Sequence, residues 1–206
     1  GGEVRDSADL IKDAVKYKSF MKNGGITATG GEPLMQLDFL IDLFEKVKEH
    51  DLHTCLDTSG IAFNSDNPDI LAKYDRLMEV TDLIMLDIKH IDPEEHIKLT
   101  KQPNDNIFKF LAYADSKEKT IWIRHVIVPG ITFIDSYLDQ LGYYIGQFHS
   151  IKALDVLPYH DMGKVKYEKM GIDYVLKDVA PLTAEDAIHA RKIILEGFKR
   201  RRAEEK

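Results

Sequence analysis

Apolar residues along this chain follow two alternating spacings. Short apolar runs predict five strands, at residues 26–29, 53–57, 82–88, 120–128 and 153–159. Between these runs, apolar residues recur three and four positions apart, which predicts helices at 7–15, 36–50, 70–78, 107–114, 134–148 and from 183 onward. Each strand therefore has a helical partner, which is typical of parallel β/α units.

Local signals refine several of these elements. Ser7 is positioned to cap the first helix, and Thr183 with Asp186 forms a capping-box pattern for the last one. The run 82–88 is almost continuously apolar, so we expect a strand buried on both faces. Five units are too few for a closed eightfold barrel, which leaves an open sheet or an incomplete barrel. Residues 161–182 have weak periodicity and predict a long loop at one end of the sheet.

Composition narrows the class of protein. The 206 residues predict a single domain, and a formal net charge of −7 argues against a nucleic-acid binder and its basic face. The basic run 199–202 is interpreted as a solvated helix end. No apolar run reaches membrane-spanning length and no signal peptide is evident. Because there is a single cysteine, no intramolecular disulfide is possible, and a reducing cytoplasmic setting is expected.

Polar groups follow every predicted strand. They comprise Gly30, Gly31 and Glu32 after the first strand, Asp57 and Thr58 at the second, Asp87, Ile88 and Lys89 at the third, Arg124 and His125 in the fourth, and Tyr159 and His160 at the fifth. Ligands of parallel β/α folds bind at the carboxyl ends of the strands. This coincidence favours a ligand site, and the carboxylate of Glu32 suggests a ligand with a positive group such as an amine.

Each of these residues also has a structural interpretation. Asp57 and Asp87 are suited to capping the turns that follow them, and Arg124 to a buried ion pair. Because neighbouring strand residues face opposite sides, only one of Arg124 and His125 is expected to face the site, and we favour Arg124. Cys55 lies within a strand and is expected to be a core residue. The remaining histidines have no ligand spacing and are assigned to surface or packing roles: His50, His53, His90, His96, His149 and His189.

Five longer strings carry a family resemblance. GGITATGGEPL, HTCLDTSG, EVTDLIMLDIKH, WIRHVIVPG and LPYHDMGKVKYEKMG resemble the activating enzymes of pyruvate formate-lyase, which are radical S-adenosylmethionine enzymes. The resemblance extends from Gly1 to the final helix. It implies an α/β fold of parallel β/α units forming an incomplete (β/α)6 partial barrel of the TIM type, with five of the six strands in this chain.

The resemblance also implies roles for individual residues. The cofactor S-adenosylmethionine is expected to contact residues after three strands: Gly30, Gly31, Glu32, Asp87, Ile88, Lys89 and His160. A monovalent cation beside the cofactor carboxylate is expected at Asp57, Thr58, Met85 and Asp87. Arg124 is expected to face the active site as a catalytic residue.

One feature of that family is missing from the sequence. Its members bind a [4Fe–4S] cluster through CxxxCxxC in a loop after the first strand, whereas this chain has only Cys55, in another segment. The chain also begins with Gly-Gly-Glu instead of methionine. We therefore expect a single domain over residues 1–206 that is truncated at its N-terminus, with no iron–sulfur ligands of its own.

The activity implied by the resemblance is formation of a glycyl radical on pyruvate formate-lyase, by reductive cleavage of S-adenosylmethionine at the cluster. The implied setting is anaerobic, fermentative cytoplasm. The implied partners are the lyase and a flavodoxin- or ferredoxin-type electron donor, with the chain itself a monomer that binds no nucleic acid or membrane. Two other classes stay open at this stage. One is a non-catalytic module that binds S-adenosylmethionine or a partner, and the other is a barrel hydrolase with a divalent metal on Asp57, Asp87 and His160.

Overall fold

The computed structural model describes residues 3–21, 24–161, 171, 176 and 179–205. The predicted loop at 161–182 lies largely outside the described residues. The elements run in the order α1 (Ser7–Val15), η1 (Lys18–Phe20), β1 (Gly25–Ala28), η2 (Pro33–Gln36), α2 (Leu37–Glu49), β2 (His53–Thr58), α3 (Pro68–Glu79), β3 (Leu83–Asp87), α4 (Pro93–Thr100), α5 (Asp105–Ser116), β4 (Thr120–Ile127), α6 (Asp135–Ile145), β5 (Ile151–Pro158) and α8 (Ala184–Glu204).

The five predicted strands are present and form one parallel sheet in the order β1-β2-β3-β4-β5. The register pairs Ala28 of β1 with Leu56 of β2, and Asp57 of β2 with Met85 of β3. The strands lie in the sheet in the same order as in the sequence. This order is typical of β/α barrels, because each helix returns the chain to the next neighbouring strand. The predicted fold class is confirmed.

Contacts divide the described chain into two compact units. The first comprises residues 1–87, 104–123 and 150–153, and the second comprises 88–103, 124–149 and 154–206. A single domain over the whole chain stays a prediction.

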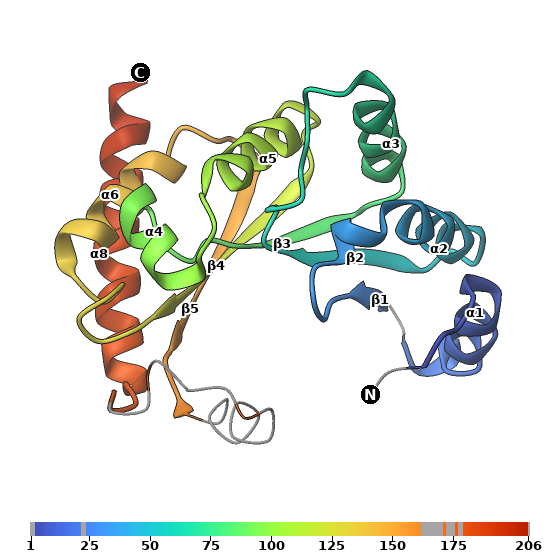
Figure 1. The fold of residues 1–206 in the computed structure, drawn as a ribbon, viewed down its shortest axis with the longest axis horizontal. Helices are drawn as coiled ribbons and strands as arrows, with labels where there is room; N and C mark the ends of the chain where they lie inside the picture. The colour runs from blue at the N-terminus through green and yellow to red at the C-terminus, as the bar shows by residue number, and fades with distance from the viewer. Residues whose placement is uncertain (1–2, 22–23, 162–170, 172–175, 177–178, 206) are drawn as a thin grey trace. The chain divides into compact units, whose positions relative to one another are not determined.

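In the first unit, apolar helix faces cover the strands. Figure 1 shows α2 on the connection from β1 to β2, and α3 on the connection from β2 to β3. α2 buries Phe44 and Val47 completely, each with 0% of its surface exposed. Beside α3, an aromatic cluster contains Phe63, Tyr74 and Phe110, with the Phe63 and Tyr74 rings 4.8 Å apart and edge-on. Burial of these rings contributes to the stability of this unit.

In the second unit, α6 and α8 pack with their backbones unusually close. A Cβ atom placed on Gly142 would lie 2.0 Å from the carbonyl oxygen of Ile194, and one on Gly197 would lie 2.5 Å from that of Asp139. Figure 1 shows the two helices as neighbours. Glycine at these two positions therefore permits this packing, since any larger residue would separate the helices.

The structure corrects three local predictions. Ser7 does not cap α1, because the carboxylate of Asp6 accepts from the backbone N–H of Asp9, and the Ser7 hydroxyl instead donates to Asp42. β3 is not buried on both faces: Ile84 is fully buried, whereas Met85 on the other face is half-buried. α4 was missed, since its short sequence PEEHIKLT has a weak apolar face. The capping box of Thr183 and Asp186 is confirmed.

Candidate cofactor site at the strand ends

The turn after β1 exposes backbone to an open space. Gly30 has φ of +106°, a conformation that residues with a Cβ atom rarely adopt. Among the described residues, a Cβ atom added at Gly30 or at Gly31 would have no neighbour within 4 Å. The first glycine is therefore required by the backbone conformation, and the second leaves room for a ligand to approach the main chain.

The carboxylate of Glu32 is held by four hydrogen bonds. Its Oε1 accepts from the hydroxyl of Thr58 at 2.5 Å and from the N–H of Leu34 at 3.1 Å. Its Oε2 accepts from the hydroxyl of Ser59 at 2.6 Å and from the Ser59 N–H at 3.1 Å. The carboxylate thus caps η2 and ties the turn after β1 to the end of β2.

This arrangement changes how Glu32 relates to a ligand. A carboxylate has about four acceptor positions, and four donors of this chain occupy them. The backbone of Gly30 and Gly31 is therefore the part of the segment open to a ligand. Burial raises the pKa of Tyr74 to about 12, and the nearby carboxylate of Glu32 adds to this shift. The charge of Glu32 therefore still acts on its surroundings.

The residues predicted to hold a cation lie on neighbouring strands of the first unit. Asp57 and Met85 are register partners, and Thr58 and Asp87 end their strands. The hydroxyl of Thr29 donates to Oδ2 of Asp57 at 3.1 Å. The first unit thus brings Asp57, Thr58, Met85 and Asp87 to adjacent strand ends, but their role toward a cation stays a prediction.

The second unit contains the remaining predicted residues. Ile88 is fully buried, its N–H donates to the carbonyl of Arg124 at 3.0 Å, and Lys89 beyond it is half-buried. The Arg124 side chain is 23% exposed, and its Nε lies 3.6 Å from Oδ2 of Asp155 on β5. His125 points to the other face, where it is 3% exposed with Nδ1 2.7 Å from the carbonyl oxygen of Ile88. This is the alternation expected for Arg124 and His125.

His160 and the other histidines differ in exposure. His160 follows β5 and is exposed, so its imidazole is open to a ligand. His90 and His96 are 1% and 2% exposed, which agrees with a packing role. Nε2 of His90 lies 3.2 Å from the carbonyl oxygen of Ile131, and Nδ1 of His96 lies 2.7 Å from that of Gln102.

Three residues of this region were not found from the sequence. Thr29 forms a hydrogen bond with Asp57, Ser59 forms one with Glu32, and Asp155 forms an ion pair with Arg124. Ser59 directly follows a strand end, and Asp155 is a charge within an otherwise apolar strand, so both carried a weak signal. Only the pairing of the strands shows which partners they have.

Three further observations concern the described residues. Among them, no group of three or more His, Cys, Asp or Glu side chains is arranged to hold a metal ion. Cys55 is 6% exposed within β2, as expected for a core residue. None of the helices in the described ranges combines the length and apolar character that crossing a bilayer requires.

Comparison with known proteins identifies the class. Residues 1–138 match the protein-family model of the Radical SAM superfamily. A domain of a pyruvate-formate lyase-activating enzyme from Bacteroides vulgatus has the same fold, with a TM-score of 0.66 and 19% identity over 84% of this chain and 94% of that one. Streptococcus suis SuiB bound to S-adenosylmethionine aligns with a TM-score of 0.59 and 15% identity, over 86% of this chain and 41% of that one. The match to this family model, over more than half of the chain, defines a radical S-adenosylmethionine protein.

A closer relative specifies the family. The chain is 45% identical over 195 residues to the pyruvate formate-lyase-activating enzyme of Listeria monocytogenes, covering 94% of this chain and 78% of the relative. The chain belongs to the family of pyruvate formate-lyase-activating enzymes.

The residues present fit one of the two cofactors of this family. The open backbone at Gly30 and Gly31, above the fixed carboxylate of Glu32, fits the approach of S-adenosylmethionine. The cluster does not fit, because the chain has one cysteine, and that thiol is buried in β2. The three thiolates that bind a [4Fe–4S] cluster are therefore not among the residues of this chain.

Proposed function

We propose that this chain is the S-adenosylmethionine-binding body of an enzyme that activates pyruvate formate-lyase by forming a glycyl radical on it. The observation that carries the proposal is the turn after β1, where open glycine backbone adjoins a glutamate fixed by four donors. The 45% identity to the Listeria protein supports the choice of substrate, because that relative is named for activating this lyase.

The chain's own residues divide into three roles. Gly30, Gly31 and Glu32 meet the methionine portion of the cofactor, and the hydrogen bonds of Glu32 support the conformation of the turn. Asp87, Ile88, Lys89 and His160 supply further contacts to the cofactor. Ile88 acts through packing, because its N–H is already bonded. Asp57, Thr58, Met85 and Asp87 hold a monovalent cation, for which carboxylate, hydroxyl and carbonyl oxygens are suitable ligands.

S-adenosylmethionine, once bound and reductively cleaved, supplies the radical that removes hydrogen from the substrate glycine. The chain positions the cofactor and excludes water. Arg124 contributes a guanidinium that forms an ion pair with Asp155 of β5, whose Oδ2 lies 3.6 Å from its Nε. A planar guanidinium is suited to binding backbone carbonyl or carboxylate oxygens of a protein substrate.

The proposed partners follow from this activity. They are the lyase as substrate and a flavodoxin- or ferredoxin-type protein as electron donor, with the activating chain acting as a monomer in the cytoplasm. A non-catalytic binding module is the second candidate, and the buried single thiol of Cys55 is the observation that favours it.

The first experiment measures binding of S-adenosylmethionine to this chain by isothermal titration calorimetry. Asp87→Ala should weaken binding by about tenfold or more, since a group at a strand end within the site is lost. The matched control is Asp66→Ala, which removes an exposed aspartate from a loop of the same unit and should leave binding unchanged. Unchanged binding in Asp87→Ala would remove this residue from the site.

The second experiment tests the activity. A segment with the CxxxCxxC pattern of the radical S-adenosylmethionine family is joined before Gly1, the cluster is reconstituted anaerobically, and the glycyl radical on the lyase is measured by electron paramagnetic resonance. The proposal expects a radical with the joined protein and none with this chain alone. Binding of S-adenosylmethionine without any cleavage by the joined, reduced protein would favour the non-catalytic module.

A further inference from the structure

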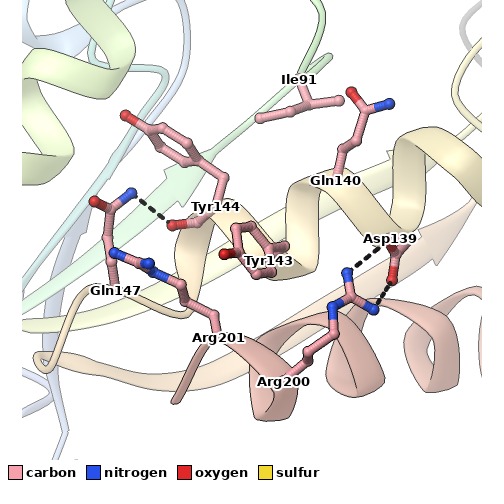
Figure 2. Close-up of a pocket in the computed structure, with 8 residues that line it drawn as sticks. All are labelled: Ile91, Asp139, Gln140, Tyr143, Tyr144, Gln147, Arg200 and Arg201. Atoms are coloured by element: carbon pink, nitrogen blue, oxygen red, sulfur yellow. Dashed lines mark hydrogen bonds and ion pairs between the residues drawn. The ribbon is translucent and has the colours of Figure 1, made fainter. Parts of the chain in front are cut away.

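A cavity lies beside α6 and α8, within the second unit. It has a volume of about 530 Å³, which is in the range of small-molecule sites. Its walls include Ile91, Tyr143, Tyr144, Gln147 and Arg201, and none of these residues is among the predicted cofactor contacts (Figure 2). The cofactor site therefore leaves this cavity unexplained.

Three consecutive arginines reach this region, and among the described residues Arg201 alone of the three has ion pairs but no hydrogen bond. Arg200 is bound by both carboxylate oxygens of Asp139, at 2.9 and 2.7 Å. Arg202 donates to the carbonyl of Phe148 at 2.6 Å. Arg201 also lines the cavity, yet its closest carboxylate oxygens, on Glu205 and Glu204, are 3.9 and 4.0 Å away, beyond hydrogen-bond range. Its side chain is 33% exposed.

The orientation of Arg201 is nevertheless restrained. Its guanidinium carbon lies 5.6 Å from the centroid of the Tyr143 ring, and that of Arg200 lies 5.2 Å from the same ring. The Tyr143 hydroxyl donates to Glu204 at 2.5 Å, which fixes the ring. Figure 2 shows Arg200 turned to Asp139 and Arg201 extending towards Gln147. A guanidinium on a fixed aromatic ring is partly organised for bidentate binding before a ligand arrives.

Other walls of the cavity are suited to an apolar body. Ile91 contributes an aliphatic side chain, and Tyr144 contributes a ring whose burial raises the pKa of its hydroxyl, so that it stays neutral. The Gln147 amide donates to the carbonyl of Tyr144 at 2.8 Å, which fixes that end of the cavity. Asp139 is an acid in the cavity wall, but its charge is matched by Arg200, and that hydrogen bond lowers the pKa of Asp139.

We propose that this cavity binds a small organic anion, with one carboxylate or phosphate group on Arg201 and a flat apolar body against Tyr144 and Ile91. An anion is favoured because the guanidinium of Arg201 offers parallel N–H donors that match both groups. An apolar body is favoured because these walls gain stability when water is removed from them. None of the wall residues is a predicted cofactor contact, and the proposal does not depend on the proposed function.

The test is a titration of the 15N-labelled chain followed through its arginine Nε–Hε resonances. The probes are phenyl phosphate and phenylacetate, which separate the two anionic groups, and benzyl alcohol, which keeps the ring without the charge. At least one anionic probe should give a saturable shift at Arg201, with a dissociation constant about tenfold lower than that of benzyl alcohol.

Matched variants assign the effect to Arg201. Arg201→Gln should weaken binding of the anionic probe about tenfold, and Arg201→Lys should weaken it by a smaller factor, since charge remains but the fork is lost. Lys192→Gln removes the same charge from an exposed position of α8 and should leave binding within about twofold of wild type. Arg201→Lys also serves as the test if Arg201→Gln does not fold. No saturable shift with either anion, equal binding of benzyl alcohol, or wild-type affinity in the Arg201 variants would overturn the proposal.

Discussion

The hydroxyl of Thr58 donates a 2.5 Å hydrogen bond to Oε1 of Glu32, and so joins the end of β2 to the turn that follows β1. The same Thr58 oxygen accepts from the N–H of Gly60 at 2.9 Å. One buried hydroxyl therefore serves two backbone turns at once. The conformation of the glycines proposed to meet the cofactor depends on a residue from the next strand.

Thr58→Val tests this connection. Valine keeps the shape of threonine but removes both hydrogen bonds, and it leaves a part-buried carboxylate short of one donor, so the free energy of unfolding should fall by about 1–3 kcal/mol. The measurement is urea unfolding followed by circular dichroism. Thr58→Ser retains the hydroxyl and loses only a methyl group, which costs about 1 kcal/mol. An equal loss in both variants would mean that packing of the methyl group, and not the hydroxyl, is what matters.

Gly31→Ala separates ligand access from folding. A methyl group at this position has no neighbour within 4 Å in the part of the chain that the structure describes, so the free energy of unfolding should change by no more than about 0.5 kcal/mol. The same methyl group would project into the space proposed for the cofactor and should weaken S-adenosylmethionine binding about tenfold. Calorimetric titration and urea unfolding of the same sample provide both values. Full affinity in the variant would place the cofactor away from this turn.

Gly142→Ala, unlike Gly31→Ala, should destabilise the fold. Its new methyl group would lie 2.0 Å from the backbone oxygen of Ile194, which cannot be relieved by a rotamer change. Separating α6 from α8 should lower the free energy of unfolding by about 1–3 kcal/mol. Ser136→Ala, at an exposed position near the start of α6, is a control that alters the same helix without touching α8. A thermal melt of Gly142→Ala that matches wild type would show that the helices are not packed this closely.

Lys101→Gly should stabilise the protein. Lys101 ends α4 with φ of +64°, a left-handed conformation in which a Cβ atom is strained. Glycine removes that strain but makes the unfolded chain more flexible, which leaves an expected net gain of about 0.5–1 kcal/mol. Lys101→Ala removes the same side chain and keeps the Cβ atom, so it should show no such gain in chemical denaturation. A gain shared by both variants would assign the effect to the lysine side chain instead.

His96 should make stability depend on pH in a mildly acidic range. Burial of the imidazole lowers the pKa of His96 below its usual 6.5, an effect that the nearby His90 and Lys89 reinforce and the hydrogen bond to Gln102 opposes. Below pH 6.5 the unfolded chain binds a proton that the folded chain excludes, so the free energy of unfolding falls as pH decreases towards the folded-state pKa.

His96→Gln removes this titration. Between about pH 7 and 5 the wild type should lose stability more steeply than the variant, by up to about 1.4 kcal/mol per pH unit. His53→Gln changes an exposed histidine of β2 and should keep the wild-type slope. The measurement is urea unfolding at a series of pH values, and identical slopes in wild type and His96→Gln would contradict the prediction.

Element types were largely predictable because they follow from local periodicity. All five strands were found from apolar runs, and the helices from residues spaced three and four apart. α4 was missed because eight residues with a weak apolar face give little periodic signal, and it is stabilised instead by the Asp92 cap and by buried His96. The strand-end position of Glu32, Asp57 and Asp87 was also readable, because it depends only on where strands stop.

What the sequence alone determined is the β/α pattern, the family and the type of residue at each strand end. Only the tertiary structure decided where those side chains point. Glu32, expected to offer its carboxylate to an amine, gives both oxygens to Leu34, Thr58 and Ser59, because parallel pairing places the end of β2 beside the turn after β1. Asp155 likewise pairs with Arg124 although 31 positions separate them in the sequence. Hydrogen bonds and ion pairs of this kind act over about 3–4 Å, and no local pattern records which distant residues the folded sheet will bring within that range.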